Sequence, residues 1–257
     1  MNVLITGASS GIGEALAVEC AKRGDTLFIC GRNRERLDAV AKTCREAGAQ
    51  SVSAETVDVS NETSTRDWLV RCDRTAPLER IFSNAGIGTG IEDEDNVRRT
   101  WATNVNGNLN VILPALELFR NAQTRRRRQI LVTASIAGYG PLATCPAYSG
   151  SKAAMKTWAL ALRGMLKKEG IEVSAICPGF VRSRITDRNT CPMPFFMEAD
   201  KAARIILRRA DRNVGLIAFP WPMRLATWWL STLPFRVNEF INSFLPAKTA
   251  KTTPTPF

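Results

Sequence analysis

The chain has 257 residues, 45% of them hydrophobic and 23% charged, which is ordinary for a globular protein with a full core. It contains no histidine, so a Ser-His-Asp triad and any histidine-bearing metal site are excluded. Acid–base chemistry must use Tyr, Lys, Cys, Asp or Glu. The seven cysteines include no C-x-x-C pair, and the N-terminus shows no leader-peptide pattern. Both features predict a cytoplasmic protein with reduced thiols and no metal site.

Short apolar runs alternate with longer helical patterns along the first two thirds of the chain. Seven runs are predicted to be strands: Val3–Thr6, Thr26–Cys30, Val52–Val57, Arg80–Ser83, Ile130–Ala134, Glu172–Cys177 and Val214–Phe219. Helices are predicted between them at about 12–24, 33–47, 62–75, 95–121 and 147–169. Continuous apolar strands suit a sheet buried on both faces. The alternation therefore predicts a single α/β domain, residues 1–219, with a doubly wound parallel sheet and helices on both faces.

A glycine-rich turn, Thr6-Gly7-Ala8-Ser9-Ser10-Gly11-Ile12-Gly13, joins the first predicted strand to the first helix. Gly7 allows a tight turn, Gly11 allows the backbone to approach a pyrophosphate, and Gly13 allows the helix to pack on the strand. The helix N-terminus adds free N–H donors for phosphate oxygens. In this context the turn predicts a nucleotide site rather than a plain tight loop.

The end of the second predicted strand indicates which nucleotide binds. Folds selective for NAD place Asp or Glu about 20 residues past the glycines, where the carboxylate holds the ribose 2′-hydroxyl. Here the sequence reads Gly31-Arg32-Asn33. Arginine cannot accept a hydrogen bond from a hydroxyl but pairs well with a 2′-phosphate. Arg32 therefore favours NADP(H) over NAD(H); the alternative is a solvated loop arginine.

Tyr148 and Lys152 stand four residues apart, where a helical pattern begins after Pro146. Residues at this spacing share a helix face, so the phenol and the ammonium can point to one place. A nearby ammonium favours phenolate, so we expect Lys152 to lower the pKa of Tyr148 towards neutral pH. Tyr148 can then exchange a proton with a carbonyl or alcohol oxygen. Ser135 follows the fifth strand at the sheet edge where ligands bind, and its hydroxyl can hold the same oxygen.

Together these residues resemble the short-chain dehydrogenase/reductase family. The shared motifs, in family order and spacing over roughly residues 2–219, are TGASSGIG (6–13), Asp58-Val59, Asn84-Ala85-Gly86, Asn104, Ser135, YSGSK (148–152) and Pro178-Gly179. The resemblance implies a Rossmann-type oxidoreductase that moves hydride between NADP(H) and a carbonyl or alcohol. Tyr148 would be the acid/base, Lys152 would bind the nicotinamide ribose and tune Tyr148, and Ser135 would polarise the substrate. Asn104 would hold a water of the proton relay.

The glycine-rich turn, Arg32 and the resemblance also predict the cofactor contacts. These are Gly7, Ser9, Ser10, Gly11, Ile12, Gly13, Arg32, Asp58, Val59, Asn84, Ala85, Gly86, Tyr148, Lys152, Pro178, Gly179, Val181 and Ser183. By the resemblance, Asp58 would contact the adenine and Asn84 and Gly86 would line the adenosine side. Pro178-Gly179 would border the nicotinamide. The family often has Thr after this pair to bind the carboxamide, and Ser183 keeps a hydroxyl there.

The segment Arg184–Met197 would cover the active site by the same resemblance. Its last seven residues, Cys191-Pro192-Met193-Pro194-Phe195-Phe196-Met197, are mostly apolar. An apolar cover favours a hydrophobic substrate, although the same side chains would also suit packing on the domain.

Residues 220–246 are predicted to be an aromatic-rich extension, and residues 247–257 a disordered tail. Val237, Phe240, Ile241 and Phe244 share one helical face. Prolines interrupt the extension too often for it to span a bilayer. Residues 180–257 hold 12 Lys/Arg against 5 Asp/Glu, within a net charge of +11. The extension would pack on its own domain or another subunit, roof the substrate pocket, or lie on an anionic membrane surface.

Other partners are predicted from the two long helices and from the densest charge run. The family commonly forms dimers or tetramers through the helices near 95–121 and 147–169, which implies a homodimer or homotetramer. The apolar residues Trp101, Val105, Trp158 and Leu162 would make that contact or belong to the core. Arg125–Arg128 lies between a helix and a strand without interleaved aromatics. We therefore expect a solvated loop and no nucleic acid.

These patterns predict an oxidoreductase that prefers NADP(H) and acts on a hydrophobic carbonyl or alcohol. Two alternatives remain: an NADP(H)-sensing binding protein on the same fold, and a membrane-surface reductase of a lipid-like carbonyl. The intact set of Ser135, Tyr148, Lys152 and Asn104 counts against the sensor.

Overall fold

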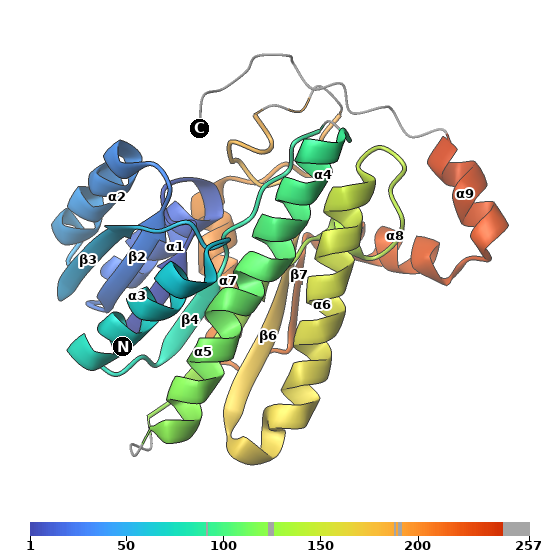
Figure 1. Cartoon of the computed structure of the whole chain (residues 1–257). Coiled ribbons are helices and arrows are strands. Elements are labelled where there is room, and N and C mark those ends of the chain that lie inside the picture. Colours follow the sequence, from blue (N-terminus) through green and yellow to red (C-terminus); the bar gives the residue numbers. More distant parts are fainter. Residues whose placement is uncertain (91, 123–125, 188, 190–191, 244–257) are drawn as a thin grey trace.

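A computed structural model describes residues 1–90, 92–122, 126–187, 189 and 192–243. The strands in these residues are β1 Asn2–Thr6, β2 Thr26–Gly31, β3 Ser51–Thr56, β4 Arg80–Ser83, β5 Arg128–Thr133, β6 Ile171–Pro178 and β7 Leu216–Phe219. They form one parallel sheet in the order β3-β2-β1-β4-β5-β6-β7 (Figure 1). The predicted fold class is confirmed, and the strand boundaries differ from prediction by one or two residues.

The helices are α1 Gly11–Ala21, α2 Arg34–Glu46, α3 Glu62–Thr75, α4 Glu94–Trp101, α5 Gly107–Asn121, α6 Pro146–Leu166, α7 Ala199–Asp211, α8 Trp221–Thr232 and α9 Phe235–Ser243. Successive residues of a strand point to opposite faces of the sheet. Val3 and Ile5 accordingly pack with α1, α2 and α7, whereas Leu4 packs with α3, α5 and α6. The sheet is thus covered on both sides, as a doubly wound fold requires.

Polar side chains fix where several helices begin. The Asn33 side chain accepts a hydrogen bond from the Arg36 backbone N–H (2.9 Å), and the Asn61 side chain accepts one from Ser64 N–H (3.0 Å). These caps satisfy N–H groups that have no partner inside the helix. Pro146 occupies the first turn of α6, where a missing N–H does no harm.

The predicted helix 95–121 is divided in two. A π-helical turn, Ala102–Asn106, separates α4 from α5. Such a turn contains an extra residue, so it changes the direction of the side chains that follow it. Asn104 lies in this turn.

The prediction of a solvated loop at Arg125–Arg128 was wrong for its last two residues. Arg127 forms an ion pair with Glu172 (2.7 Å). Arg128 begins β5 and donates to the backbone oxygens of Phe119 (2.8 Å) and Glu169 (2.7 Å). The carbonyl groups at a helix C-terminus lack partners in the helix, so arginine is a favourable neighbour there. Arg125 lies outside the described residues.

The four apolar candidates for a subunit contact have different environments. Leu162 is buried in the core, which is one of the two alternatives predicted for it. Val105 and Trp158 are partly buried against the same cluster, and Trp101 is 40% exposed. Within the described residues, no helix is long and apolar enough to cross a membrane. Phe244 and the predicted tail 247–257 lie outside them.

Candidate active site

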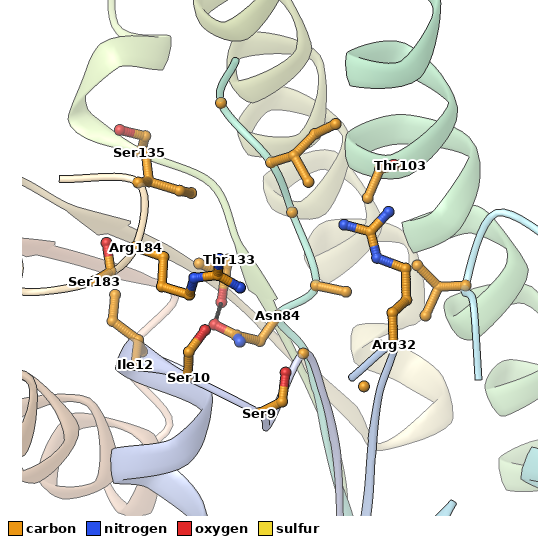
Figure 2. Close-up of a pocket in the computed structure, with 18 of the residues that line it drawn as sticks. Ser9, Ser10, Ile12, Arg32, Asn84, Thr103, Thr133, Ser135, Ser183 and Arg184 are labelled. Carbon is orange, nitrogen blue, oxygen red and sulfur yellow. Dashed lines mark hydrogen bonds between the residues drawn. The ribbon is translucent and has the colours of Figure 1, made fainter. Parts of the chain in front are cut away.

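A cleft of about 670 Å³ opens at the carboxyl end of the sheet. It is lined by seventeen of the predicted site residues: Gly7, Ser9, Ser10, Ile12, Arg32, Asp58, Val59, Asn84, Ala85, Gly86, Ser135, Tyr148, Lys152, Pro178, Gly179, Val181 and Ser183. Figure 2 shows side chains from several loops converging on it. Parallel strands end at one edge of the sheet, which is why residues so far apart in sequence meet here.

The glycine-rich turn forms one wall of the cleft. Gly7 has φ +66°, and a Cβ there would lie 2.8 Å from the Cα of Ala85. A Cβ on Gly13 would lie 2.3 Å from the Gly7 carbonyl oxygen, so this glycine allows α1 to pack on the turn. Gly11 faces Ser183 instead of the open cleft. Ser10 precedes α1 and makes no side-chain capping bond, which leaves the first N–H groups of the helix available to an anion.

Asn84 connects three strands at this edge. Its Nδ2 donates to the Thr6 carbonyl oxygen (3.1 Å), and its Oδ1 accepts from the Thr133 hydroxyl (3.1 Å). The backbone N–H of Asn84 donates to the Thr6 hydroxyl (3.0 Å). These bonds hold the floor of the cleft in one arrangement.

Asn104 is fully buried behind the wall of the cleft. Its Oδ1 accepts from the Ile87 N–H (2.7 Å), and its Nδ2 donates to the Ile87 carbonyl (2.9 Å) and the Ser151 hydroxyl (3.1 Å). The side chain therefore ties the loop after β4 to the helix that carries Tyr148. The Asn104 carbonyl oxygen also accepts from the Asn108 side chain (2.7 Å).

Tyr148 and Lys152 lie together on the first turns of α6. Lys152 Nζ donates to the Thr133 carbonyl oxygen (2.8 Å) and lies 5.8 Å from the centre of the Tyr148 ring. Gly86 keeps the space beside them open, because a Cβ there would lie 3.1 Å from Lys152 Nζ. The shared helix face predicted from their spacing is confirmed.

The predicted direction of the Tyr148 pKa was wrong. Burial raises the pKa of Tyr148 to about 12, although a side-chain hydrogen bond with Ser135 acts in the opposite direction. Burial also lowers the pKa of Lys152 to about 8. The low-dielectric surroundings penalise the charged form of both groups, and this is the largest cause of each shift. A buried phenol beside Ser135 is therefore protonated at neutral pH.

Two further predicted residues also serve local structure. Asp58 Oδ1 accepts from the Ser60 N–H (3.0 Å) and hydroxyl (2.8 Å), as a turn residue at a strand end does. The Ser183 N–H donates to the Thr186 hydroxyl (2.8 Å). Thr186 lines the cleft but was missed from the sequence, although it follows Ser183 by three residues.

The most prominent feature missed from the sequence is the charge of the cleft. Of the described residues that line it, Arg32, Arg36, Arg99 and Arg184 are arginines, and Asp58 is the one carboxylate. Figure 2 shows Arg32 and Arg184 entering the cleft from different walls. Burial lowers the pKa of Arg36, and the positive charge of Arg184 lowers it further. Arg36 Nε is buried without a hydrogen-bond partner in the described residues.

The four-residue spacing between Arg32 and Arg36 was the one sequence signal for this cluster. Nothing in the local sequence placed Arg99 or Arg184 beside them, since they come from α4 and from the segment after β6. Gathered cations with so few carboxylates suit an anionic ligand.

Comparison with known proteins identifies the family. The sequence model of the short chain dehydrogenase family matches residues 1–192. The chain belongs to this family. This chain is therefore an oxidoreductase with a Rossmann-type fold, as the resemblance implied.

Its relatives include proteins of similar length. Over 239 residues it is 34% identical to an uncharacterized oxidoreductase of Myxococcus xanthus (strain DK1622), covering 90% of this chain and 92% of that protein. It is 30% identical over 262 residues to 11-beta-hydroxysteroid dehydrogenase A of Sesamum indicum, and the match covers 93% of this chain and 73% of that protein. Among solved structures, a short-chain dehydrogenase from Sphingobium yanoikuyae in complex with NADPH matches with TM-score 0.77 and 26% identity. The match covers 97% of this chain and 98% of that chain.

Proposed function

We propose that this short chain dehydrogenase reduces a hydrophobic ketone or aldehyde with NADPH, and that Tyr148 donates the proton. The same site would oxidise the matching alcohol with NADP⁺. One observation carries the proposal: the arginine-lined part of the cleft is continuous with Ser135, Tyr148 and Lys152, so that a phosphate-rich ligand and the proton donor share one cavity.

The residues present fit a dinucleotide that carries a 2′-phosphate. The uncapped N-terminus of α1 and the turn at Gly7 would hold the pyrophosphate. Arg32 and Arg36 would hold the 2′-phosphate, and the buried Arg36 Nε would gain the acceptor that it lacks within the described chain. The NADPH complex of the Sphingobium yanoikuyae protein supports this choice. When bound, the reduced nicotinamide supplies hydride to the carbonyl carbon.

The remaining chemistry belongs to the chain's own side chains. Tyr148, protonated at neutral pH because its pKa is raised to about 12, donates its proton to the carbonyl oxygen. Ser135, which forms a hydrogen bond with Tyr148, would polarise that oxygen. The Lys152 ammonium would stabilise the phenolate left behind. The protonated resting phenol favours the reductive direction, since oxidation of an alcohol would start from phenolate.

The substrate class rests on the apolar side chains around the proton donor. Ile87, Val181 and Ile185 line the cleft with Tyr148. In the covering segment, Phe195 is 57% exposed and Phe196 38% exposed, so apolar surface is also available at the segment after β6. The name of the Sesamum indicum relative refers to a hydroxysteroid, a hydrophobic alcohol, and supports the same class.

Replacing Tyr148 with Phe tests the mechanism, and the chain's other tyrosine provides a matched control. We expect Tyr148→Phe to lower kcat by about 10²–10⁴, the usual contribution of a general acid, with NADPH binding unchanged. Tyr139→Phe should keep its activity, because Tyr139 does not line the cleft. The assay is NADPH oxidation with ketones and aldehydes of increasing chain length.

Each outcome of this assay has a defined meaning. Wild-type activity that survives in Tyr148→Phe would disprove the proposed proton donor. A preference for short polar carbonyls would disprove the substrate class. Tight NADPH binding with no turnover across the whole series would favour the sensor instead.

A further inference from the structure

Helix α8 turns its bulky apolar side chains away from the protein. Trp221, Leu225, Trp228 and Trp229 follow the spacing i, i+4, i+7, i+8, so they share one helix face. Their exposed fractions are 73%, 54%, 55% and 56%. A surface helix normally turns such a face towards the core. Half of the six tryptophans in the chain therefore lie on one exposed helix face.

The opposite face of α8 makes the contacts that fix this orientation. Met223 packs on Gly179, where an added Cβ would lie 3.0 Å from the Met223 sulfur. The Asn238 side chain donates to the Leu230 carbonyl oxygen (2.9 Å), which joins α9 to α8. Because Met223 packs inward on Gly179, α8 cannot turn its tryptophans inward without losing this contact.

Helix α9 extends the exposed surface. Val237 is 44% exposed and Phe240 65% exposed. We call Trp221, Leu225, Trp228, Trp229, Val237 and Phe240 the α8–α9 patch. Figure 1 shows the two helices standing beside the body of the protein, beyond α6. Exposed apolar side chains gathered in this way mark interaction surfaces in soluble folds.

The charge around the patch indicates its partner. Arg224 and Arg236 lie on these helices against a single acid, Glu239. A second copy of this chain, with its own net charge of +11, would bring like charges together. An anionic surface would complement them. Tryptophan suits a lipid–water boundary in particular, because its ring is apolar and its N–H is polar.

We propose that the α8–α9 patch docks on the surface of a lipid bilayer that contains anionic headgroups. The tryptophans enter the boundary region, and the surrounding cations contact the headgroups. Helix α8 follows directly on β7 and packs on Gly179 at the border of the cleft, so docking brings the cleft close to the bilayer. The proposal does not rest on the reaction that the cleft performs.

Vesicle sedimentation of the full chain tests the docking. One set of vesicles contains phosphatidylglycerol mixed with phosphatidylcholine, and the other contains phosphatidylcholine alone. The variant is Trp221→Ser/Trp228→Ser/Trp229→Ser. The control is Leu113→Ser/Met165→Ser, which removes apolar side chains of similar exposure (53% and 63%) from α5 and α6. Circular dichroism and NADPH binding check that each protein is folded.

We expect the wild type and the control to sediment with phosphatidylglycerol vesicles. The tryptophan variant should bind these vesicles at least about tenfold more weakly. Binding should weaken in 0.5 M salt, which screens the attraction between the cations and the headgroups, and on phosphatidylcholine alone, which lacks anionic headgroups. In the wild type, tryptophan fluorescence should shift to shorter wavelength when vesicles are added. Equal binding by the tryptophan variant, or no wild-type binding, overturns the proposal. The proposal is also overturned if the wild type forms a dimer that does not bind vesicles, and the tryptophan substitutions, but not the control substitutions, dissociate that dimer.

Discussion

The two ends of the sheet use arginine in opposite ways. At the amino end, Arg80 is fully buried and donates to Gln129 (2.7 Å) and Asp211 (2.8 Å), while Arg23 shares Asp211 (3.0 Å). At the carboxyl end, Arg36 and three other arginines line a cleft in which Asp58 is the one carboxylate among the described lining residues. The first group binds acceptors of the chain itself; the second, we propose, also binds the phosphate groups of a ligand.

This difference separates stability from binding. A buried arginine that donates to buried groups of the chain is part of the folded structure, and its removal leaves a buried acceptor, here the Gln129 oxygen, without its donor. Several arginines gathered around one cleft create a positive potential that favours an anionic ligand. Substitutions at the amino end should therefore lower stability, and those in the cleft should lower cofactor affinity. Two predictions test this division, and a third tests the proton chemistry of the same cleft; the largest expected effect comes first.

Arg80→Ala should lower the free energy of unfolding by about 2–3 kcal/mol, because it leaves the fully buried Gln129 side-chain oxygen without its donor and removes one of the two arginines that pair with the Asp211 carboxylate. Urea unfolding measures the loss. Arg23→Ala removes an exposed partner of the same carboxylate and should change stability by about 0.5 kcal/mol. The ratio of NADPH to NADH affinity should stay the same in both variants. A change in that ratio with Arg80→Ala would remove the distinction between the two ends.

Arg36→Ala should weaken NADPH binding by about 10- to 100-fold, the equivalent of one lost hydrogen bond to a charged group. Binding of NADH should be unchanged, since NADH has no 2′-phosphate. Stability should not fall, because Arg36 has a buried Nε without a partner in the described residues. Arg34→Ala is the matched control: Arg34 lies on the same helix and pairs with Asp38 (2.7 Å) outside the cleft. Equal loss of both nucleotides in Arg36→Ala would contradict a 2′-phosphate role.

The reduction rate should fall about tenfold by pH 9, because Lys152 loses its proton as the pH rises through its pKa of about 8. Tyr148, with a pKa of about 12, stays protonated over this range and does not contribute to the decrease. The measurement is kcat against pH. Lys152→Arg keeps its charge, so its rate should not show this alkaline decrease. A wild-type rate that rises between pH 7 and pH 9 would show that phenolate, not phenol, is the active form.

Features that depend on local spacing could be predicted from the sequence. The apolar runs identified every strand of the sheet within one or two residues, and the glycine-rich turn was placed between β1 and α1. Tyr148 and Lys152 share a helix face because four residues make about one turn. Ser135 and Asn84 could be placed at the cleft because each follows a strand whose carboxyl end lies at the same edge.

Features that depend on how distant segments pack could not be predicted. The pKa of Tyr148 moves in the direction opposite to prediction because burial, which spacing does not reveal, outweighs the hydrogen bond with Ser135. Arg184 lies close enough to Arg36 to lower its pKa because of the course that the segment after β6 takes, and local sequence does not reveal that course. In α8 the helical spacing defines an apolar face, but packing of Met223 on Gly179 decides that this face turns outward.

The affinities of NADPH and NADH for the wild-type protein test the central claim most directly. Both dissociation constants can be measured by the change in nicotinamide fluorescence in the same buffer at moderate salt. If the cleft arginines bind a 2′-phosphate, NADPH should bind at least about tenfold more tightly than NADH, and the difference should shrink as salt is added. Equal affinity for the two nucleotides would contradict the account.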